Sequence, residues 1–286
     1  MNNTLGVLIG YSKGKDLVAA FKKAKETGLS SCQLCIWDES LYSKENALEV
    51  KAALEATDFK ISTVWAGWDG PKEWNATYGP STIGLVPEAY RESRMNALIK
   101  ASDFAAILGV PYIATHVGFL PMDPYDPKFV GTIGALRYVC QYMKKREQTF
   151  LFETGQETPI TVVRAIETIG TGNCGINFDT ANLLLYGTGN ALDAIDLFGK
   201  YVRDTHIKDG IPPTDGFGGG HQTPVGEGCA NIPEIIKKLR RIGYEGPFTI
   251  EREISGPQQE KDIAAARELI LRWMDEAEAA VSAEEA

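Results

Sequence analysis

Short apolar runs alternate with longer amphipathic segments along the chain. The apolar runs are often rich in β-branched residues, as strands covered on both faces of a parallel sheet tend to be. Their length favours strands over helices. The eight predicted strands are Leu5–Gly10, Ser31–Trp37, Lys60–Ala66, Pro111–His116, Thr149–Glu153, Cys174–Phe178, Val202–Ile207 and Pro247–Glu251.

The segments between these runs have the apolar spacing of helices, and several carry boundary signals. Gly28 and Gly109 follow two of the segments, where a C-terminal capping glycine is common. Pro159 and Pro233 stand in the first turn of two others. The predicted helices are Lys15–Thr27, Lys44–Ala56, Pro87–Leu108, Lys128–Arg146, Pro159–Ile169, Ala191–Phe198, Ile232–Ile242 and Gln259–Ala277.

Eight strands that alternate with eight helices predict an α/β fold with parallel strands. The count of eight favours closure into a (β/α)8 barrel, a TIM barrel, over an open doubly wound sheet. No glycine-rich dinucleotide motif follows the first strand, which weakens the open-sheet alternative. We therefore predict one domain over residues 1–277. The remaining residues, 278–286, are small and acidic and predict a short frayed tail.

Three predicted connections after strands are long. Trp65–Leu85 contains Trp68, Trp74 and Tyr78, and His116–Pro127 follows the fourth strand. Lys208–Ala230 follows the seventh strand and carries four glycines between residues 216 and 220. In an α/β barrel these connections build the active site. The sequence thus predicts a pocket with aromatic walls and a glycine-hinged lid.

Composition and charge narrow the functional classes. The 286 residues carry a net charge of −9, which disfavours nucleic acid as a partner because that affinity comes largely from Lys and Arg. No segment has the roughly 20 apolar residues of a membrane helix. Met1–Gly10 lacks the features of a signal peptide. Cys32 and Cys35 lie three apart in a predicted strand, so they point to opposite faces and predict packed thiols rather than a redox or zinc pair. A reducing, cytoplasmic location is expected.

Four residues with metal-binding side chains stand at the ends of four successive predicted strands. They are Glu153, Asp179, His206 and Glu251. In a closed barrel these positions converge on one mouth, where three carboxylates without a cation would repel one another. A divalent ion removes that repulsion. One imidazole with several oxygens suits Mn²⁺, Mg²⁺ or Co²⁺ better than a structural zinc site.

The residues around these positions resemble the sugar phosphate isomerase/epimerase branch of the xylose-isomerase-like barrel superfamily. That branch includes ketose 3-epimerases, hydroxypyruvate isomerase and inosose dehydratase. The resemblance spans nearly the whole chain. Its most specific pieces are Phe152-Glu153, Asn177-Phe178-Asp179-Thr180, His206-Ile207-Lys208-Asp209, Val225-Gly226-Glu227-Gly228 and Ile250-Glu251.

The resemblance implies roles for the four residues. They would hold one divalent ion, with Mn²⁺ as the first choice and Mg²⁺, Co²⁺ or Zn²⁺ as the others. Glu153 and Glu251 would also act as acid and base on opposite faces of a keto-sugar, through a metal-stabilised enediolate. Family members are commonly dimers or tetramers, so a homo-oligomer is expected and a hetero-oligomer stays open.

Two departures from the ketose 3-epimerases weaken simple 3-epimerisation. Asn182 stands where those enzymes often carry a histidine that touches the substrate. Asn can donate a hydrogen bond but cannot exchange a proton near neutral pH. The arginine of the epimerase loop after the metal histidine has no clear counterpart, and that loop carries His221 instead.

Further polar and aromatic residues at predicted strand ends are candidates for contact with substrate. We expect His116 and His221 to act in catalysis, with a packed or a solvated histidine as the respective alternative. Glu227 is expected to form a turn near the mouth. The candidate substrate-binding residues are Trp65, Trp68, Glu157, Asn182 and Lys208.

Three other functions compete with a sugar isomerase or epimerase. The first is a lyase, since the same enediolate next to a leaving group would eliminate water or cleave a 3-keto-glycoside. The second is a DNA-repair endonuclease with a three-zinc cluster, which three histidines and a charge of −9 disfavour. The third is a non-catalytic relative that binds a sugar or a partner protein, against which the intact ligand set argues.

Overall fold

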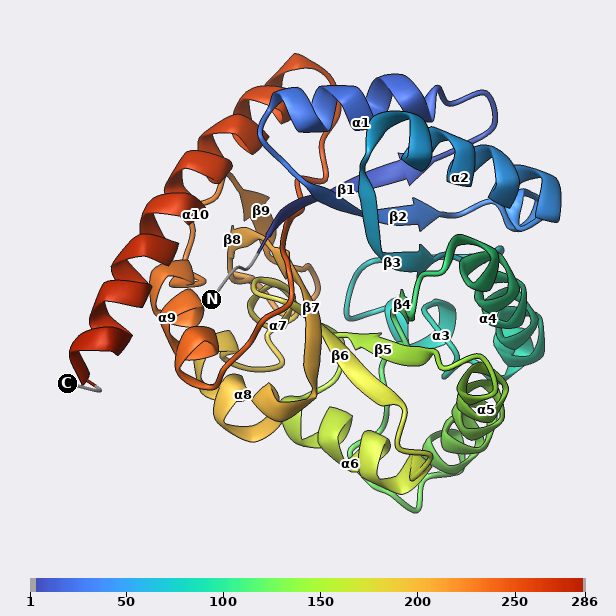
Figure 1. Ribbon diagram of the computed structural model, residues 1–286. Coiled ribbons are helices and arrows are strands. Elements are labelled where there is room, and N and C mark those ends of the chain that lie inside the picture. The colour runs from blue at the N-terminus through green and yellow to red at the C-terminus, as the bar shows by residue number, and fades with distance from the viewer. Residues whose placement is uncertain (1–3, 285–286) are drawn as a thin grey trace.

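The structure is a computed structural model that describes residues 4–284. Eight parallel strands close into a barrel in the order β1-β10-β7-β6-β5-β4-β3-β2. Figure 1 shows helices around this barrel. The strands are β1 (Leu5–Tyr11), β2 (Ser31–Ile36), β3 (Lys60–Ala66), β4 (Tyr112–Thr115), β5 (Thr149–Glu153), β6 (Cys174–Asp179), β7 (Val202–Ile207) and β10 (Phe248–Ile250). The predicted TIM barrel is confirmed.

A helix follows each barrel strand, and side-chain caps fix several helix starts. Asp16, Ser43, Thr158 and Asn190 each accept a hydrogen bond from a backbone N–H of the first turn. The helices that cover the barrel are α1 (Leu17–Glu26), α2 (Lys44–Thr57), α4 (Glu88–Leu108), α5 (Pro127–Lys144), α6 (Pro159–Ile169), α8 (Ala191–Phe198), α9 (Ile232–Arg241) and α10 (Pro257–Glu284). The short elements are η1 (Glu39–Leu41), α3 (Gly79–Thr82), α7 (Asn182–Leu185) and η2 (Gly199–Tyr201).

The barrel interior is polar near the site, while the main apolar core fills the layer between strands and helices. Asp204 on β7 is buried and accepts hydrogen bonds from Thr63 (2.7 Å) and Thr249 (3.1 Å) across the barrel. Strand register then sets the site: Asp179 pairs with His206, and His206 pairs with Thr249, two residues before Glu251. The carboxyl ends of β5, β6, β7 and β10 therefore meet at one mouth.

The last helix is longer than the sequence predicted. α10 continues to Glu284, so the predicted frayed tail from residue 278 is wrong for residues 278–284, and residues 285–286 lie outside the described part. Ala and Glu are good helix formers, which explains why the helix continues through residues 278–284. Glu278 also lies 3.6 Å from the guanidinium of Arg240 on α9.

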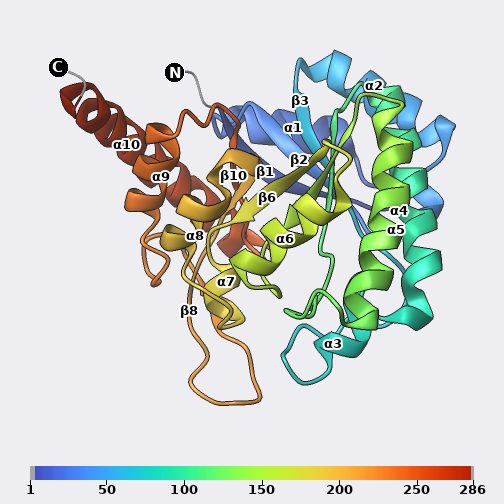
Figure 2. The same ribbon diagram turned by 90° about the horizontal axis from the view of Figure 1, so that it is seen from below.

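The glycine-rich segment after β7 is more ordered than a plain loop. β8 (Asp209–Ile211) and β9 (His221–Thr223) form a two-stranded antiparallel hairpin outside the barrel. Figure 2 shows that this hairpin and the β3–α4 connection extend from the same end of the barrel. The sequence missed the hairpin because each strand has three residues and no alternating pattern.

Among the helices within residues 4–284, none is long and apolar enough to cross a membrane. The predicted compartment and oligomeric state stay predictions.

Candidate metal and substrate site

The four residues of the predicted metal site lie together in the barrel mouth. Each offers a ligand atom, and these atoms all lie within 4.8 Å of one another. His206 Nδ1 is 3.2 Å from an oxygen of Glu153 and 3.2 Å from an oxygen of Glu251. Asp179 Oδ2 lies 3.9 Å from the same nitrogen. The imidazole thus stands between three carboxylates from β5, β6 and the end of β10.

The four side chains lie at two depths. Asp179 and His206 are fully buried and do not line the cavity above them. Glu153 and Glu251 are also buried, yet both line that cavity. The two glutamates can therefore contact a small molecule in the cavity. Asp179 and His206 lie behind them, outside the cavity lining.

The charges in this cluster are strongly coupled. Burial raises the pKa of Asp179 to about 8, and the nearby Glu251 and Glu153 add to that rise against the opposing charge of Lys208. Burial also acts to raise the pKa of Glu251, but Lys208 and His206 outweigh it and hold that pKa well below its usual value. The pKa of His206 is raised well above normal, because Glu251 and Glu153 overcome its burial.

These residues fit a divalent cation. Asp179 Oδ1 accepts hydrogen bonds from the backbone N–H groups of Ala181 (2.8 Å) and Asn182 (2.7 Å). Asp179 Oδ2 is buried and accepts no hydrogen bond among the described residues, and the ammonium of Lys208 lies 3.6 Å from it. That separation is longer than a hydrogen bond, so this buried oxygen still lacks the direct partner that a metal ion would supply. The donor set of three carboxylates and one imidazole suits a hard or borderline divalent ion.

Gln33 on β2 orients the imidazole of His206. Its Oε1 lies 2.8 Å from His206 Nε2, and both side chains are fully buried. Its amide nitrogen donates to Asn177 Oδ1 (2.8 Å) and, at 3.4 Å, to the carbonyl of Thr205. The nearby Thr205 carbonyl favours the NH₂ group at this atom, so that Oε1 accepts from Nε2–H. Nδ1 then faces the carboxylates, and a metal ion that replaced its proton would bind its lone pair.

Lys208 lies beside the acidic cluster, surrounded by carboxylates. Its Nζ is 3.2 Å from Glu251, 3.6 Å from Asp179 and 3.0 Å from Glu253. The side chain is almost fully buried, whereas that of Glu253 is 57% exposed. Burial disfavours the charged ammonium, but the carboxylates outweigh it and raise the pKa of Lys208 well above normal. Lys208 therefore carries a positive charge that its neighbours already compensate.

A cavity of about 420 Å³ opens above the two glutamates, within the size range of small-molecule sites. One wall is aromatic: Trp37 lies 4.9 Å from Trp65 and 6.1 Å from Trp74, between ring centroids. Trp65 Nε1 also donates a hydrogen bond to Glu153. A second part of the lining is polar. Its residues are Glu153, Asn182, Lys208, Gln222, Glu251 and Glu253.

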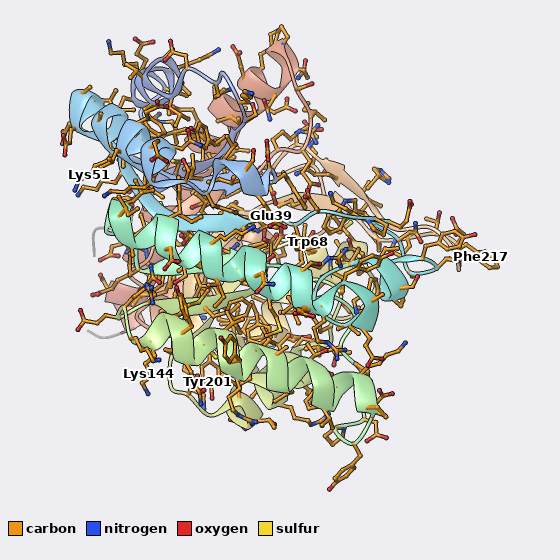
Figure 3. The ribbon with its side chains drawn as sticks, turned by 90° about the vertical axis from the view of Figure 1, so that its right-hand side faces the viewer. Glu39, Lys51, Trp68, Lys144, Tyr201 and Phe217 are labelled. Carbon is orange, nitrogen blue, oxygen red and sulfur yellow. The ribbon has the colours of Figure 1, made fainter. Side chains whose placement is uncertain are left out.

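The β8–β9 hairpin closes one side of the cavity. Gln222 donates to the carbonyl of Glu251 at 3.1 Å, and its Oε1 accepts from the backbone N–H of Glu253 at 2.9 Å. Gly220 N donates to the Leu185 carbonyl at 2.7 Å, where an added Cβ would meet backbone at 2.2 Å, so glycine is required. Figure 3 shows Phe217 at the outer end of this hairpin.

Three of the other predicted residues lie at the cavity. Trp65 is in the aromatic wall, and His116 Nε2 lies 3.3 Å from Glu153. Burial lowers the pKa of His116 against the opposing effect of Glu153. Asn182 lies in the polar part of the lining, with its Nδ2 at 3.5 Å from Glu153.

The structure places three predicted residues away from the cavity lining. Trp68 is buried beside Trp65 and Trp74, and the guanidinium of Arg94 lies 5.0 Å from its ring centre. Glu157 is buried, and burial raises its pKa to about 8. His221 is exposed on β9 and points away, because its strand neighbour Gln222 takes the inward position.

Glu227 lies in a turn that Asp209 organises. Asp209 accepts hydrogen bonds from the backbone N–H groups of Gly226 (2.9 Å), Gly228 (3.1 Å) and Ala230 (3.0 Å). The glutamate itself is exposed. The sequence predicted a turn for this motif, and the structure has one there, after the hairpin.

Sequence reasoning missed Gln33, Trp37, Gln222 and Glu253. Gln33 lies mid-strand, where an inward glutamine has no distinctive pattern. Glu253 stands two residues after Glu251, an alternation that places both side chains on one face of an extended chain. That signal was available. Trp37 and Gln222 depend on how the connections fold.

Comparisons with known proteins identify the family and the fold. A sequence model of the family described as "Xylose isomerase-like TIM barrel" matches residues 21–276. The crystal structure of a xylose isomerase domain protein from Planctomyces limnophilus is similar, with 30% identity and a TM-score of 0.87 over 96% of this chain and 98% of that chain.

Two more distant structures share the fold. A xylose isomerase-like TIM barrel protein from Mycobacterium smegmatis in complex with magnesium has 17% identity and a TM-score of 0.72, over 97% of this chain and 99% of that one. An L-ribulose 3-epimerase has 15% identity and a TM-score of 0.75, over 100% and 99%. The sequence is also 24% identical over 119 residues to the protein MJ1311 of Methanocaldococcus jannaschii, a match that spans 41% of this chain and 37% of that protein.

Proposed function

Because this chain belongs to the xylose isomerase-like TIM barrel family, we propose that it is a divalent-metal-dependent isomerase or epimerase of a keto-sugar or sugar derivative. One observation carries the proposal. Of the four clustered metal-binding side chains, the two glutamates line the cavity and the other two do not. Two carboxylates that face a bound sugar can act as the base and the acid of a proton transfer.

Glu153, Asp179, His206 and Glu251 would hold the ion, with Mn²⁺ as our first choice and Mg²⁺ next, given the magnesium complex of a structural relative. When bound, a divalent ion supplies Lewis-acid stabilisation of negative charge on a carbonyl oxygen. The L-ribulose 3-epimerase that shares this fold supports a sugar substrate.

The side chains of this protein perform the proton transfers. One glutamate removes a proton from the carbon next to the carbonyl, which gives an enediolate. For epimerisation, the other glutamate delivers to the opposite face a proton that it takes up from solvent. For isomerisation, a proton is delivered to the former carbonyl carbon while the hydroxyl proton of the first carbon moves to the former carbonyl oxygen. Trp65 Nε1 holds Glu153 in place, and Lys208 holds Glu251 at 3.2 Å. The aromatic wall covers the apolar face of the sugar.

Solvent deuterium exchange tests this proposal. Protein loaded with Mn²⁺ is incubated in D₂O with a panel of ketoses and 3-keto-glycosides, and incorporation is followed by mass spectrometry. We expect exchange that stops with chelator and in Glu153→Gln. Absence of exchange across the whole panel would contradict the proposal. Loss of water or of an aglycone, instead of inversion or a shifted carbonyl, would favour the lyase alternative on the same ligand set.

A further inference from the structure

The charged groups of the cavity are strongly unbalanced. Three of the residues that line it are carboxylates: Glu153, Glu251 and Glu253. Asp179 adds a fourth just beneath. Among the described lining residues, Lys208 alone carries an ammonium or guanidinium group. Even a bound divalent ion would leave the four carboxylates and Lys208 with a net negative charge.

Lys208 has little capacity left for an anionic ligand. Its ammonium has three hydrogen-bond donors, and three carboxylates from Glu253, Glu251 and Asp179 lie 3.0–3.6 Å away. Its side chain is 3% exposed, so these neighbours enclose it. A phosphate that approached Lys208 would have to displace Glu253, the most exposed of the three, and would then face the other carboxylates.

The remaining cations near the mouth are engaged elsewhere. Arg252 follows Glu251, but its guanidinium lies 2.7 Å from Asp262 and 2.9 Å from Gln222 Oε1. Lys72 donates to the carbonyls of Trp68 (3.1 Å) and Gly70 (3.2 Å), outside the cavity lining. Phosphate sites in α/β barrels use free N–H groups or cations after the last strands. Here, the segment after β10 supplies Glu253.

We infer that the substrate of this site is an uncharged polyhydroxylated carbonyl compound and that Glu253, paired with Lys208, excludes phosphorylated sugars. The inference rests on the proposed function, whose substrate class it narrows. The Lys208–Glu253 pair offers donors and acceptors to neutral hydroxyl groups. The tryptophan wall offers an apolar surface to the C–H face of the same molecule. A dianionic ester finds no free ammonium or guanidinium group among the described residues that line the cavity.

Matched pairs of sugars test the inference. Mn²⁺-loaded protein is titrated with D-fructose and D-fructose 6-phosphate, and with D-ribulose and D-ribulose 5-phosphate. Tryptophan fluorescence reports binding, because Trp37, Trp65 and Trp74 line the cavity. We expect the uncharged member of a pair to bind at least about tenfold more tightly. Equal or tighter binding of the phosphate esters, or no binding of any uncharged ketose, would overturn the inference.

The variant Glu253→Gln identifies the source of the discrimination. Removing this partly exposed charge should shift the preference towards the phosphate ester by roughly fivefold, the scale of a solvent-accessible ion pair. Glu227→Gln removes an equal charge from an exposed position outside the lining and should leave the preference unchanged. An equal shift in both variants would contradict a specific role for Glu253.

Deuterium exchange on the same sugars keeps this inference separate from the proposed function. Exchange into the phosphate esters alone would overturn the inference about the substrate, while the proposed enediolate mechanism would stand. Exchange into neither class would overturn the proposed function itself.

Discussion

The two walls of the cavity differ in how the chain builds them. Glu153 and Glu251 form the acidic wall, and Asp179 and His206 lie behind it. All four stand at the ends of β5, β6, β7 and β10, where strand register fixes each side chain. The tryptophan wall comes from Trp37, just beyond β2, from Trp65 on β3 and from Trp74 in the long β3–α4 connection. Strand ends hold the proposed reacting groups, whereas Trp37 and Trp74 from connections, together with Trp65 on β3, shape the space for the substrate.

The largest effect should come from the acidic wall. We expect Glu153→Gln to lower the exchange rate about 10⁴-fold even at saturating Mn²⁺, because the variant lacks a proton-transfer group that faces the cavity. Asp179→Asn is the matched control. It weakens the metal site but leaves both cavity glutamates, so excess Mn²⁺ should restore a substantial part of the rate. If both variants lost the same exchange rate and excess Mn²⁺ restored neither, Glu153 and Asp179 would not have the different roles assigned to them.

Glu157 should contribute to the pH dependence of stability near this wall, as should Asp179, whose pKa is also raised to about 8. Burial raises the pKa of Glu157 to about 8, far above the value of an unfolded chain, and neither carboxylate oxygen meets a hydrogen-bond partner among the described residues. A raised folded-state pKa means that its contribution is fully present near pH 4 and is lost as pH rises towards 8. The full shift corresponds to roughly 5 kcal/mol as an upper limit.

Thermal unfolding of Glu157→Gln checks this prediction. The variant should match the parent at pH 4–5 and exceed its melting temperature increasingly towards pH 8. A constant difference across that range would show that the Glu157 carboxyl does not titrate with a raised pKa.

Gln33 tests whether the barrel interior prepares the metal site. In Gln33→Leu the Nε2–H of His206 loses its acceptor, so the orientation and tautomer that leave Nδ1 free are no longer fixed. We expect Mn²⁺ affinity to fall by about 10- to 100-fold by calorimetry. Gln33→Glu keeps an acceptor at that position and should retain more affinity than the leucine variant. The reverse order would contradict the assigned tautomer.

The smallest effects should separate two residues of the tryptophan wall. Trp65→Phe removes the hydrogen bond to Glu153, so kcat should fall roughly tenfold with little change in KM. Trp74→Ala removes part of the wall at the rim and should raise KM by a similar factor with little change in kcat. If Trp65→Phe changed only KM, the hydrogen bond to Glu153 would have no role in catalysis.

This contrast between walls also explains what the sequence could predict. The strands, the barrel and the four metal-binding residues followed from apolar periodicity and from side chains that stand at strand ends. The hairpin β8–β9 and the inward position of Gln222 did not, because three-residue strands carry no periodic signal. The sequence also carried no sign that His221 and Gln222 lie on a strand. Their side chains therefore could not be assigned to opposite faces, and His221 was expected at the substrate.

Two other predicted residues, Trp68 and Glu157, lie outside the cavity lining, and their contact with substrate stays a prediction. Trp68 and Glu157 follow strands closely, as substrate-binding residues do, yet both side chains turn into the protein. Sequence position alone does not distinguish a side chain at the cavity from one outside its lining.

Anomalous diffraction from crystals grown with Mn²⁺ tests the central claim most directly. We predict one strong manganese peak between Glu153, Asp179, His206 and Glu251, with Nδ1 as the ligand atom of the imidazole. A fully ordered site without a peak there, or a peak held by other side chains, would contradict the account.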